Sequence, residues 1–149
     1  MSKEFNWPLV YTAQSKMYFF CRDAVSEFTI NQHAVPLHPF QLFGYFLNDR
    51  VPRDDIREAN NTLVHRADQL WIFGSEISNG VIVEVDYALA AGKPIRYFTI
   101  AAKASEIVEI DRESLTFEAE LLTMVDNNVD GLRDVLTGNV RFDALIKQS

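Results

Sequence analysis

The chain has 149 residues, the length of one domain that buries its own core. Apolar residues make up 48% and charged residues 23% of it, a balance typical of a folded globular protein rather than a disordered chain. The net charge of −7 disfavours a binding surface for long nucleic acid. The single cysteine, Cys21, excludes an internal disulfide and fits a reducing compartment.

No stretch has the pattern of a secretion signal, and no apolar run approaches the roughly 20 residues that span a bilayer. The sequence therefore predicts no membrane partner and a cytoplasmic location. The 11 phenylalanines suit a packed core, a subunit interface or a wall that stacks on a planar ligand.

Strand and helix patterns alternate along the chain. The predicted strands are Pro8–Ala13, Ala34–Leu37, Leu70–Phe73, Ile95–Ile100 and, as an edge strand, Glu106–Ile110. The predicted helices are Lys16–Asn31, the segment from Asp54 to Ala67, the segment between Asn79 and Gly92, Thr116–Val125, Gly131–Leu136 and Phe142–Ile146, with Asp126–Asp130 as a polar connector. This order predicts one domain over residues 1–149, a three-layer α/β sandwich with a flavodoxin-like or Rossmann-like parallel sheet of about five strands.

Two predicted strands, Leu70–Phe73 and Ile95–Ile100, are separated by a single amphipathic helix that Gly92 and Pro94 end. This arrangement predicts a right-handed crossover between parallel strands. Ligands of such sheets bind beyond the carboxyl ends of the strands, which here means the segment from Gly74 to Asn79.

Glu84 is the main catalytic candidate on that helix. The helix places four apolar residues in one stripe, namely Val81, Val85, Ala88 and Leu89. Glu84 falls beside the stripe, whereas Asp86 points the other way and can be solvated. A partly desolvated carboxylate near a helix N-terminus suits a nucleophile or a general base. The alternative is a carboxylate at the margin of the stripe that reaches solvent or a nearby loop.

Other polar residues are predicted at the same edge of the sheet. Tyr11, Thr12, Gln14 and Ser15 lie at the end of the first strand, and Glu76 follows the third. Ser78 is placed to bind a phosphate or hydroxyl group, to cap the helix, or to do both. Asp68 enters the third strand from the opposite edge, so we expect it to cap or orient the end of the preceding helix.

The sequence lacks the motifs of several common nucleotide-binding, catalytic and metal sites. It has no glycine-rich dinucleotide motif after the first strand, no phosphate-binding Gly-x-x-x-x-Gly-Lys motif and no serine-hydrolase elbow. His33, His38 and His65 lack the spacing of known metal motifs. We therefore expect neither a cofactor nor a metal.

Four segments together resemble a known family. They are Val10-Tyr11-Thr12-Ala13, Leu-Trp-Ile-Phe-Gly ending at Gly74, the run from Ser78-Asn79-Gly80 to Glu84, and Gly92-Lys93-Pro94-Ile95. Over roughly Leu9 to Thr99 the chain resembles the nucleoside 2-deoxyribosyltransferase-like superfamily, including the 2′-deoxynucleoside 5′-phosphate N-hydrolases.

The resemblance implies a role for individual residues. Glu84 matches the nucleophile that attacks the anomeric carbon of the sugar, and Tyr11 matches the tyrosine that orients it. Ser78, with Gly80, matches the segment that binds a 5′-phosphate, which favours a nucleotide over a nucleoside. Val81 replaces the family's usual methionine, and the branched Val83 is expected close to the Glu84 carboxylate. These two changes indicate either a narrowed pocket or lost activity.

The same resemblance indicates further substrate-binding residues. Gln14 and Ser15 lie where the hydrolases hold phosphate, although the family's glycine and arginine are missing, so that Lys16 or Arg22 must supply the positive charge. His38, after the second strand, is a further candidate.

We therefore expect an N-glycosidase or (deoxy)ribosyltransferase that acts on a nucleotide or nucleoside through Glu84, in a homo-oligomer. One alternative is a nucleotide-binding or nucleotide-sensing protein of the same fold without turnover. Another is an interaction protein that uses the aromatic segment Phe40–Phe46. The longer segment Phe40–Val51 is predicted as a loop with a helical turn that covers the site or faces a second subunit.

Overall fold

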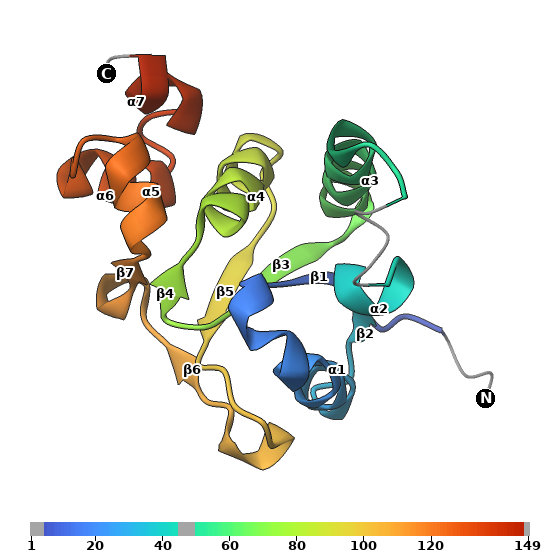
Figure 1. The fold of residues 1–149 in the computed structure, drawn as a ribbon. Coiled ribbons are helices and arrows are strands. Elements are labelled where there is room, and N and C mark those ends of the chain that lie inside the picture. Colours follow the sequence, from blue (N-terminus) through green and yellow to red (C-terminus); the bar gives the residue numbers. More distant parts are fainter. Residues whose placement is uncertain (1–4, 45–49, 148–149) are drawn as a thin grey trace.

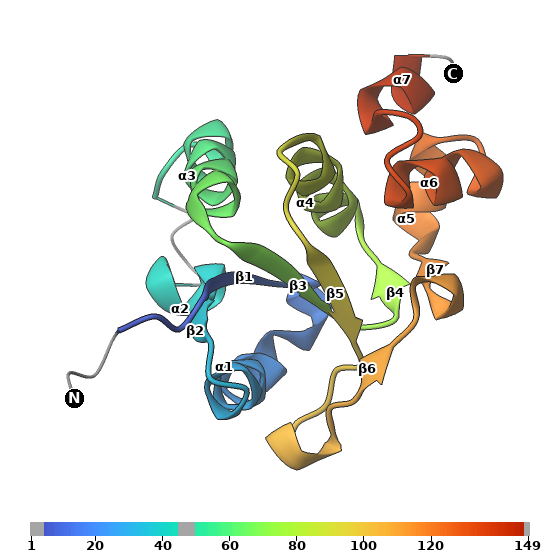
Figure 2. The same ribbon diagram turned by 180° about the vertical axis from the view of Figure 1, so that it is seen from behind.

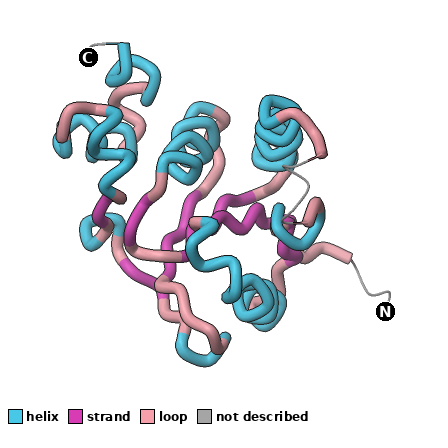
Figure 3. Tube along the Cα trace, in the orientation of Figure 1, coloured by secondary structure: helices cyan, strands magenta, loops and turns pink. Residues whose placement is uncertain are grey.

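A five-stranded sheet in the order β2-β1-β3-β5-β6 is the centre of the computed structural model, which describes residues 5–44 and 50–147. Its strands are β1 (Leu9–Gln14), β2 (Val35–Leu37), β3 (Gln69–Phe73), β5 (Ile95–Phe98) and β6 (Glu109–Ile110). The first four strands in this list are parallel, and β6 is antiparallel to β5. Figure 3 shows these strands between helices on two sides.

Helices cover both faces of the sheet (Figures 1 and 2). The helix α1 (Arg22–Asn31) covers one face, and α3 (Arg53–Arg66) and α4 (Asn79–Ala90) cover the other. The remaining helical segments are η1 (Lys16–Cys21), α2 (Pro39–Leu42), η3 (Ala104–Glu106), η4 (Arg112–Ser114), α5 (Ala119–Met124), α6 (Val129–Leu136) and α7 (Phe142–Lys147). The fold is the predicted three-layer α/β sandwich. None of the helices in the described ranges is both long and apolar enough to cross a membrane.

Alternate residues of the strands pack on opposite faces of the sheet. Tyr11 and Leu70 belong to the core on the side of α3 and α4, whereas Trp71 and Phe73 belong to the core on the side of α1. Burying a leucine-sized side chain stabilises the fold by about 1.5–3 kcal/mol. The alternation of apolar residues therefore determines which face of each strand packs against which helix.

Helix α4, which follows β3, has three of the four residues of its predicted apolar stripe on its inward face, whereas Leu89 is only partly buried. On α4, Val81, Val85 and Ala88 are buried. The helix begins after Ser78, whose Oγ accepts a hydrogen bond from Val81 N at 3.2 Å. It ends before Gly92, whose φ of +73° is readily adopted only by a residue without a Cβ.

The predicted single helix Lys16–Asn31 is wrong in its first part. Residues Lys16–Cys21 form a 3-10 helix in which Tyr18 has non-helical backbone angles. Because a 3-10 helix has about three residues per turn, it does not continue the apolar stripe of the α-helix that follows. Met17 and Phe20 have the helical spacing of a core-facing stripe in the sequence, but they are 64% and 68% exposed in the structure.

Two very short strands were not predicted. Strand β4 (Glu76–Ile77) pairs in parallel with β7 (Thr116–Phe117), where Ile77 lies opposite Phe117. The expected helix Thr116–Val125 is therefore a strand followed by the shorter helix α5. Both Ile77 and Phe117 are buried, and their burial outweighs the weak helical pattern of the segment.

Other boundaries differ from the prediction. The edge strand was expected to be parallel and to begin at Glu106, but it is antiparallel and begins at Glu109, since Glu106 ends η3. Helix α6 begins at Val129, inside the predicted connector Asp126–Asp130. Of the predicted loop Phe40–Val51, and of the aromatic segment Phe40–Phe46 within it, residues 45–49 lie outside the described ranges.

Candidate functional site

A cavity of about 360 Å³ lies at the carboxyl ends of β1 and β3. Strand β1 leads to α1 on one face of the sheet and β3 leads to α4 on the other, so this is a point at which ligands bind in parallel α/β folds. Its lining includes seven of the residues predicted for the site, namely Tyr11, Gln14, Ser15, His38, Ser78, Gly80 and Glu84.

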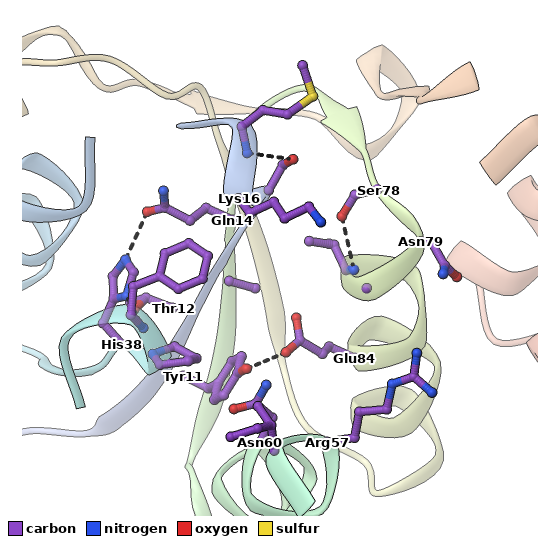
Figure 4. A pocket seen from close by; sticks show the side chains of 18 of the residues that line it. Tyr11, Thr12, Gln14, Lys16, His38, Arg57, Asn60, Ser78, Asn79 and Glu84 are labelled. Atoms are coloured by element: carbon purple, nitrogen blue, oxygen red, sulfur yellow. Dashed lines mark hydrogen bonds between the residues drawn. The ribbon is translucent and has the colours of Figure 1, made fainter. Parts of the chain in front are cut away.

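Tyr11 and Glu84 form a pair in this cavity (Figure 4). The phenolic hydroxyl of Tyr11 donates a hydrogen bond to Glu84 Oε2. Burial raises the pKa of Glu84 to about 7, an effect that the Tyr11 hydrogen bond partly offsets. Burial and the neighbouring carboxylate raise the pKa of Tyr11, which therefore remains a proton donor at neutral pH. Within the described residues, Glu84 Oε1 has no hydrogen-bond partner.

The N-terminus of α4 lies on the same wall of the cavity as Glu84. Ser78 caps this helix through its Oγ, and the Ser78 hydroxyl can still donate a hydrogen bond. First-turn amides of an α-helix have no acceptor within the helix, so those of Asn79 and Gly80 are donors for a ligand. A Cβ added at Gly80 would meet no atom within 4 Å, which means that the space beside it is open.

His38 and Gln14 fix the loop that follows β1. His38 Nδ1 accepts a hydrogen bond from Phe40 N at 3.2 Å, so His38 Nε2 donates to Gln14 Oε1 at 2.8 Å. Gln14 Nε2 in turn donates to Tyr18 O at 2.7 Å. Burial lowers the pKa of His38 to about 4, so its ring is neutral at pH 7. These two side chains are largely occupied in holding the loop.

Positive charge reaches the cavity from two elements. Lys16 lines it from the start of η1, and Arg53 and Arg57 line it from α3. Arg22 was expected to contribute, but its guanidinium lies over the Phe19 ring at 4.0 Å and donates to Phe19 O, outside the cavity.

The arginines of α3 and Asn60 were not predicted as site residues. Their spacing is a signal that was present in the sequence, since Arg53, Arg57 and Asn60 fall on one helical face. Glu118 and Glu120 also line the cavity. They had no comparable signal, because the unpredicted pairing of β4 with β7 brings them there.

Three buried oxygen atoms of the cavity lining have no hydrogen-bond partner among the described residues. They are Thr12 Oγ1, Asn60 Oδ1 and Glu118 Oε2. Leaving a buried polar atom unpaired costs about 1–3 kcal/mol, so each can contribute to binding a ligand that carries hydrogen-bond donors.

Four residues that the sequence analysis considers lie outside the cavity lining. Asp68 is at the opposite edge of the sheet as expected, but it accepts a hydrogen bond from Leu9 N rather than orienting a helix end. Glu76 is exposed in β4. Val83 does not narrow the cavity, since it is 40% exposed and outside the lining. Asp86 was expected to be solvated, but it accepts a hydrogen bond from Arg141 at 2.9 Å.

The chemistry available in the cavity is that of a carboxylate held by a tyrosine. A carboxylate with one oxygen bonded and the other free can attack an electrophilic carbon or take up a proton. Within residues 5–44 and 50–147, no group of three or more His, Cys, Asp or Glu side chains is arranged to hold a metal ion.

A comparison with known protein families matches residues 12–98, which run from β1 to the end of β5 and include Gln14, Ser15, His38, Ser78, Gly80 and Glu84. A comparison with curated proteins gave no match. The family model matches more than half of the chain, and the protein therefore belongs to the family described as Domain of unknown function (DUF7768).

Proposed function

We propose that this protein cleaves or transfers the N-glycosidic bond of a nucleoside or nucleotide, with Glu84 as the nucleophile. The observation that carries the proposal is the Tyr11–Glu84 hydrogen bond in a cavity at the ligand edge of the sheet. Tyr11 and Glu84 are the two residues to which the family resemblance attaches catalytic roles, so the resemblance and the geometry lead to the same pair.

In the proposed reaction, Glu84 Oε1 attacks the anomeric carbon while Oε2 remains bonded to Tyr11. The bond between this carbon and the base nitrogen breaks, and the base leaves with the electron pair and takes a proton from solvent. The sugar is then held by an ester bond to Oε1. Water, or the nitrogen of a second base, attacks the same carbon, loses a proton, and releases the Glu84 carboxylate.

The surroundings of Glu84 suit this chemistry. The carbon under attack gains positive charge, which a partly buried carboxylate stabilises more strongly than one in water. The α4 N-terminus with Ser78 lies beside the proposed nucleophile, where its donors can bind the oxygen on the 5′ carbon of the sugar. Asn60 lies close to the Tyr11–Glu84 pair in Figure 4, and its carbonyl oxygen, which no described residue bonds, can accept a hydrogen bond from a ligand.

A second candidate function is nucleoside or nucleotide binding without turnover. The first loop favours it, because that loop lacks the glycine and arginine of the family resemblance and Arg22 lies outside the cavity.

Base release from a panel of nucleosides and their 5′-monophosphates, followed by chromatography, tests the proposal. The wild type is compared with Glu84→Gln, which preserves size and removes the nucleophile. Release by the wild type that Glu84→Gln abolishes supports the enzyme. No release from any substrate, together with equal ligand binding by both proteins, supports binding without turnover.

A further inference from the structure

Glu118 and Ser78 are neighbours in the cavity, although they come from distant parts of the chain. Ile77 of β4 pairs with Phe117 of β7 in a parallel register, and Glu118 N donates to Ile77 O at 2.9 Å. Ser78 and Glu118 directly follow these two paired residues, so they leave the small sheet side by side. Both line the cavity.

One oxygen of the Glu118 side chain is buried without a partner. Oε2 has no hydrogen bond from any described residue. Because a carboxylate oxygen only accepts hydrogen bonds, the ligand group that satisfies it must be a donor.

The N-terminus of α4, beside Glu118, needs a hydrogen-bond acceptor rather than a donor. The amides of Asn79 and Gly80, and the Ser78 hydroxyl, are donors that need an acceptor. A hydroxyl group accepts and donates at the same atom, so one sugar hydroxyl can satisfy the helix end and Glu118 together. A phosphoryl group at neutral pH offers acceptors and nearly two negative charges, and it would lie against the carboxylate.

We propose that Glu118 is a specificity-determining residue that makes the α4 end of the cavity accept a sugar hydroxyl and reject a phosphoryl group. The preferred substrates are then nucleosides rather than their 5′-monophosphates. This inference rests on the proposed function, and it departs from the family resemblance, which assigns a 5′-phosphate to Ser78.

The cations of the cavity do not reverse this preference. Arg53 and Lys16 are exposed, and a cation on a long solvated side chain adds little to binding, even though Lys16 points toward Ser78 in Figure 4. Lys16 can also donate to a hydroxyl oxygen. Arg57 lies well away from Ser78, beyond Glu84 in the same view.

The test compares kcat/KM for a 2′-deoxynucleoside and for its 5′-monophosphate in the wild type, in Glu118→Gln and in Glu106→Gln. Glu118→Gln removes the charge and preserves the size. Glu106→Gln removes the same charge from η3, outside the cavity. The wild type should prefer the nucleoside, and Glu118→Gln should shift the ratio toward the monophosphate at least about tenfold. The ratio in Glu106→Gln should equal that of the wild type.

A wild type that prefers the monophosphate, or a ratio that Glu118→Gln leaves unchanged, overturns the inference while base release still supports the proposed function. If no protein releases base, calorimetric binding of the same two ligands decides. Tighter binding of the nucleoside that Glu118→Gln abolishes supports the role of Glu118 and leaves the proposed catalysis without support. If neither ligand binds, both proposals fail.

Discussion

The Tyr11 hydroxyl donates to Glu84 Oε2 across the space between β1 and α4, joining two residues that are 73 positions apart. This bond stabilises the charged form of a carboxyl group that burial keeps largely protonated below neutral pH. The protonation state of Glu84 at a given pH therefore depends on Tyr11.

Replacing Tyr11 by phenylalanine should raise the pKa of Glu84 above its value of about 7. A hydrogen bond to a charged group is worth about 1.5–3 kcal/mol, which corresponds to roughly one to two pH units. The midpoint is measured by NMR titration of protein with ¹³C-labelled glutamate side chains. Tyr87→Phe, a change on α4 outside the cavity, is the control. An unchanged or lower midpoint in Tyr11→Phe would contradict the assignment.

Glu84 should make the folded protein less stable as the pH rises. Its pKa is about 7 when folded and about 4.5 when unfolded, so between these values the folded state holds more protons. Stability is then lost as the pH rises from about 4.5 through 7. Glu84→Gln should be more stable than the wild type at pH 8 by about 1–3 kcal/mol, and the difference should shrink toward pH 5. Urea unfolding at several pH values measures it, and a difference that does not change with pH would show that Glu84 does not titrate in this range.

His38 should make the folded protein less stable as the pH falls. Burial lowers its pKa from 6.5 to about 4, so the unfolded state holds more protons between these values. Its contribution is present above about pH 6.5 and is lost as the pH falls toward 4. In His38→Asn, stability should therefore fall less between pH 6.5 and 4 than in the wild type, by about 1–3 kcal/mol. Parallel pH profiles of the two proteins would contradict the buried neutral ring.

Ser78 should contribute to stability as a helix cap. Its Oγ accepts a hydrogen bond from Val81 N, and loss of such a cap costs about 1 kcal/mol. Ser78→Ala should lower the unfolding free energy by that amount, whereas Ser78→Asn, which can still cap and adds no charge beside Glu118, should not. Ser105→Ala in η3, where serine caps no helix, is the control. Equal stability of Ser78→Ala and Ser78→Asn would show that the cap contributes nothing.

The main elements of the fold could be predicted because their signals are local. The run Leu70–Phe73, the helix that follows and the run from Ile95 each have the period of the structure they form. The strands β4 and β7 have two residues each, too few to show a period, so their pairing depends on the burial of Ile77 and Phe117.

The site was predictable only in part, because most of the contacts that form it join residues far apart in the sequence. The periodicity of α4 indicates that Glu84 lies at the margin of the inward-facing apolar stripe. The contact between Glu84 and Tyr11, however, depends on how the helix packs on the sheet. The arginines of α3 share a face that the sequence shows, although nothing local says that a cavity lies beside it. Glu118 reaches the cavity through a strand pair that has no sequence signal.

The stereochemistry of base displacement tests the central claim, that Glu84 forms a bond to the sugar, most directly. With methanol as acceptor, the first methyl glycoside formed is identified by proton NMR before it can rearrange. Two successive displacements at the anomeric carbon, the first by Glu84, predict a product with the configuration of the substrate. An inverted product would mean that the acceptor attacks directly, and it would contradict the role of Glu84 as nucleophile.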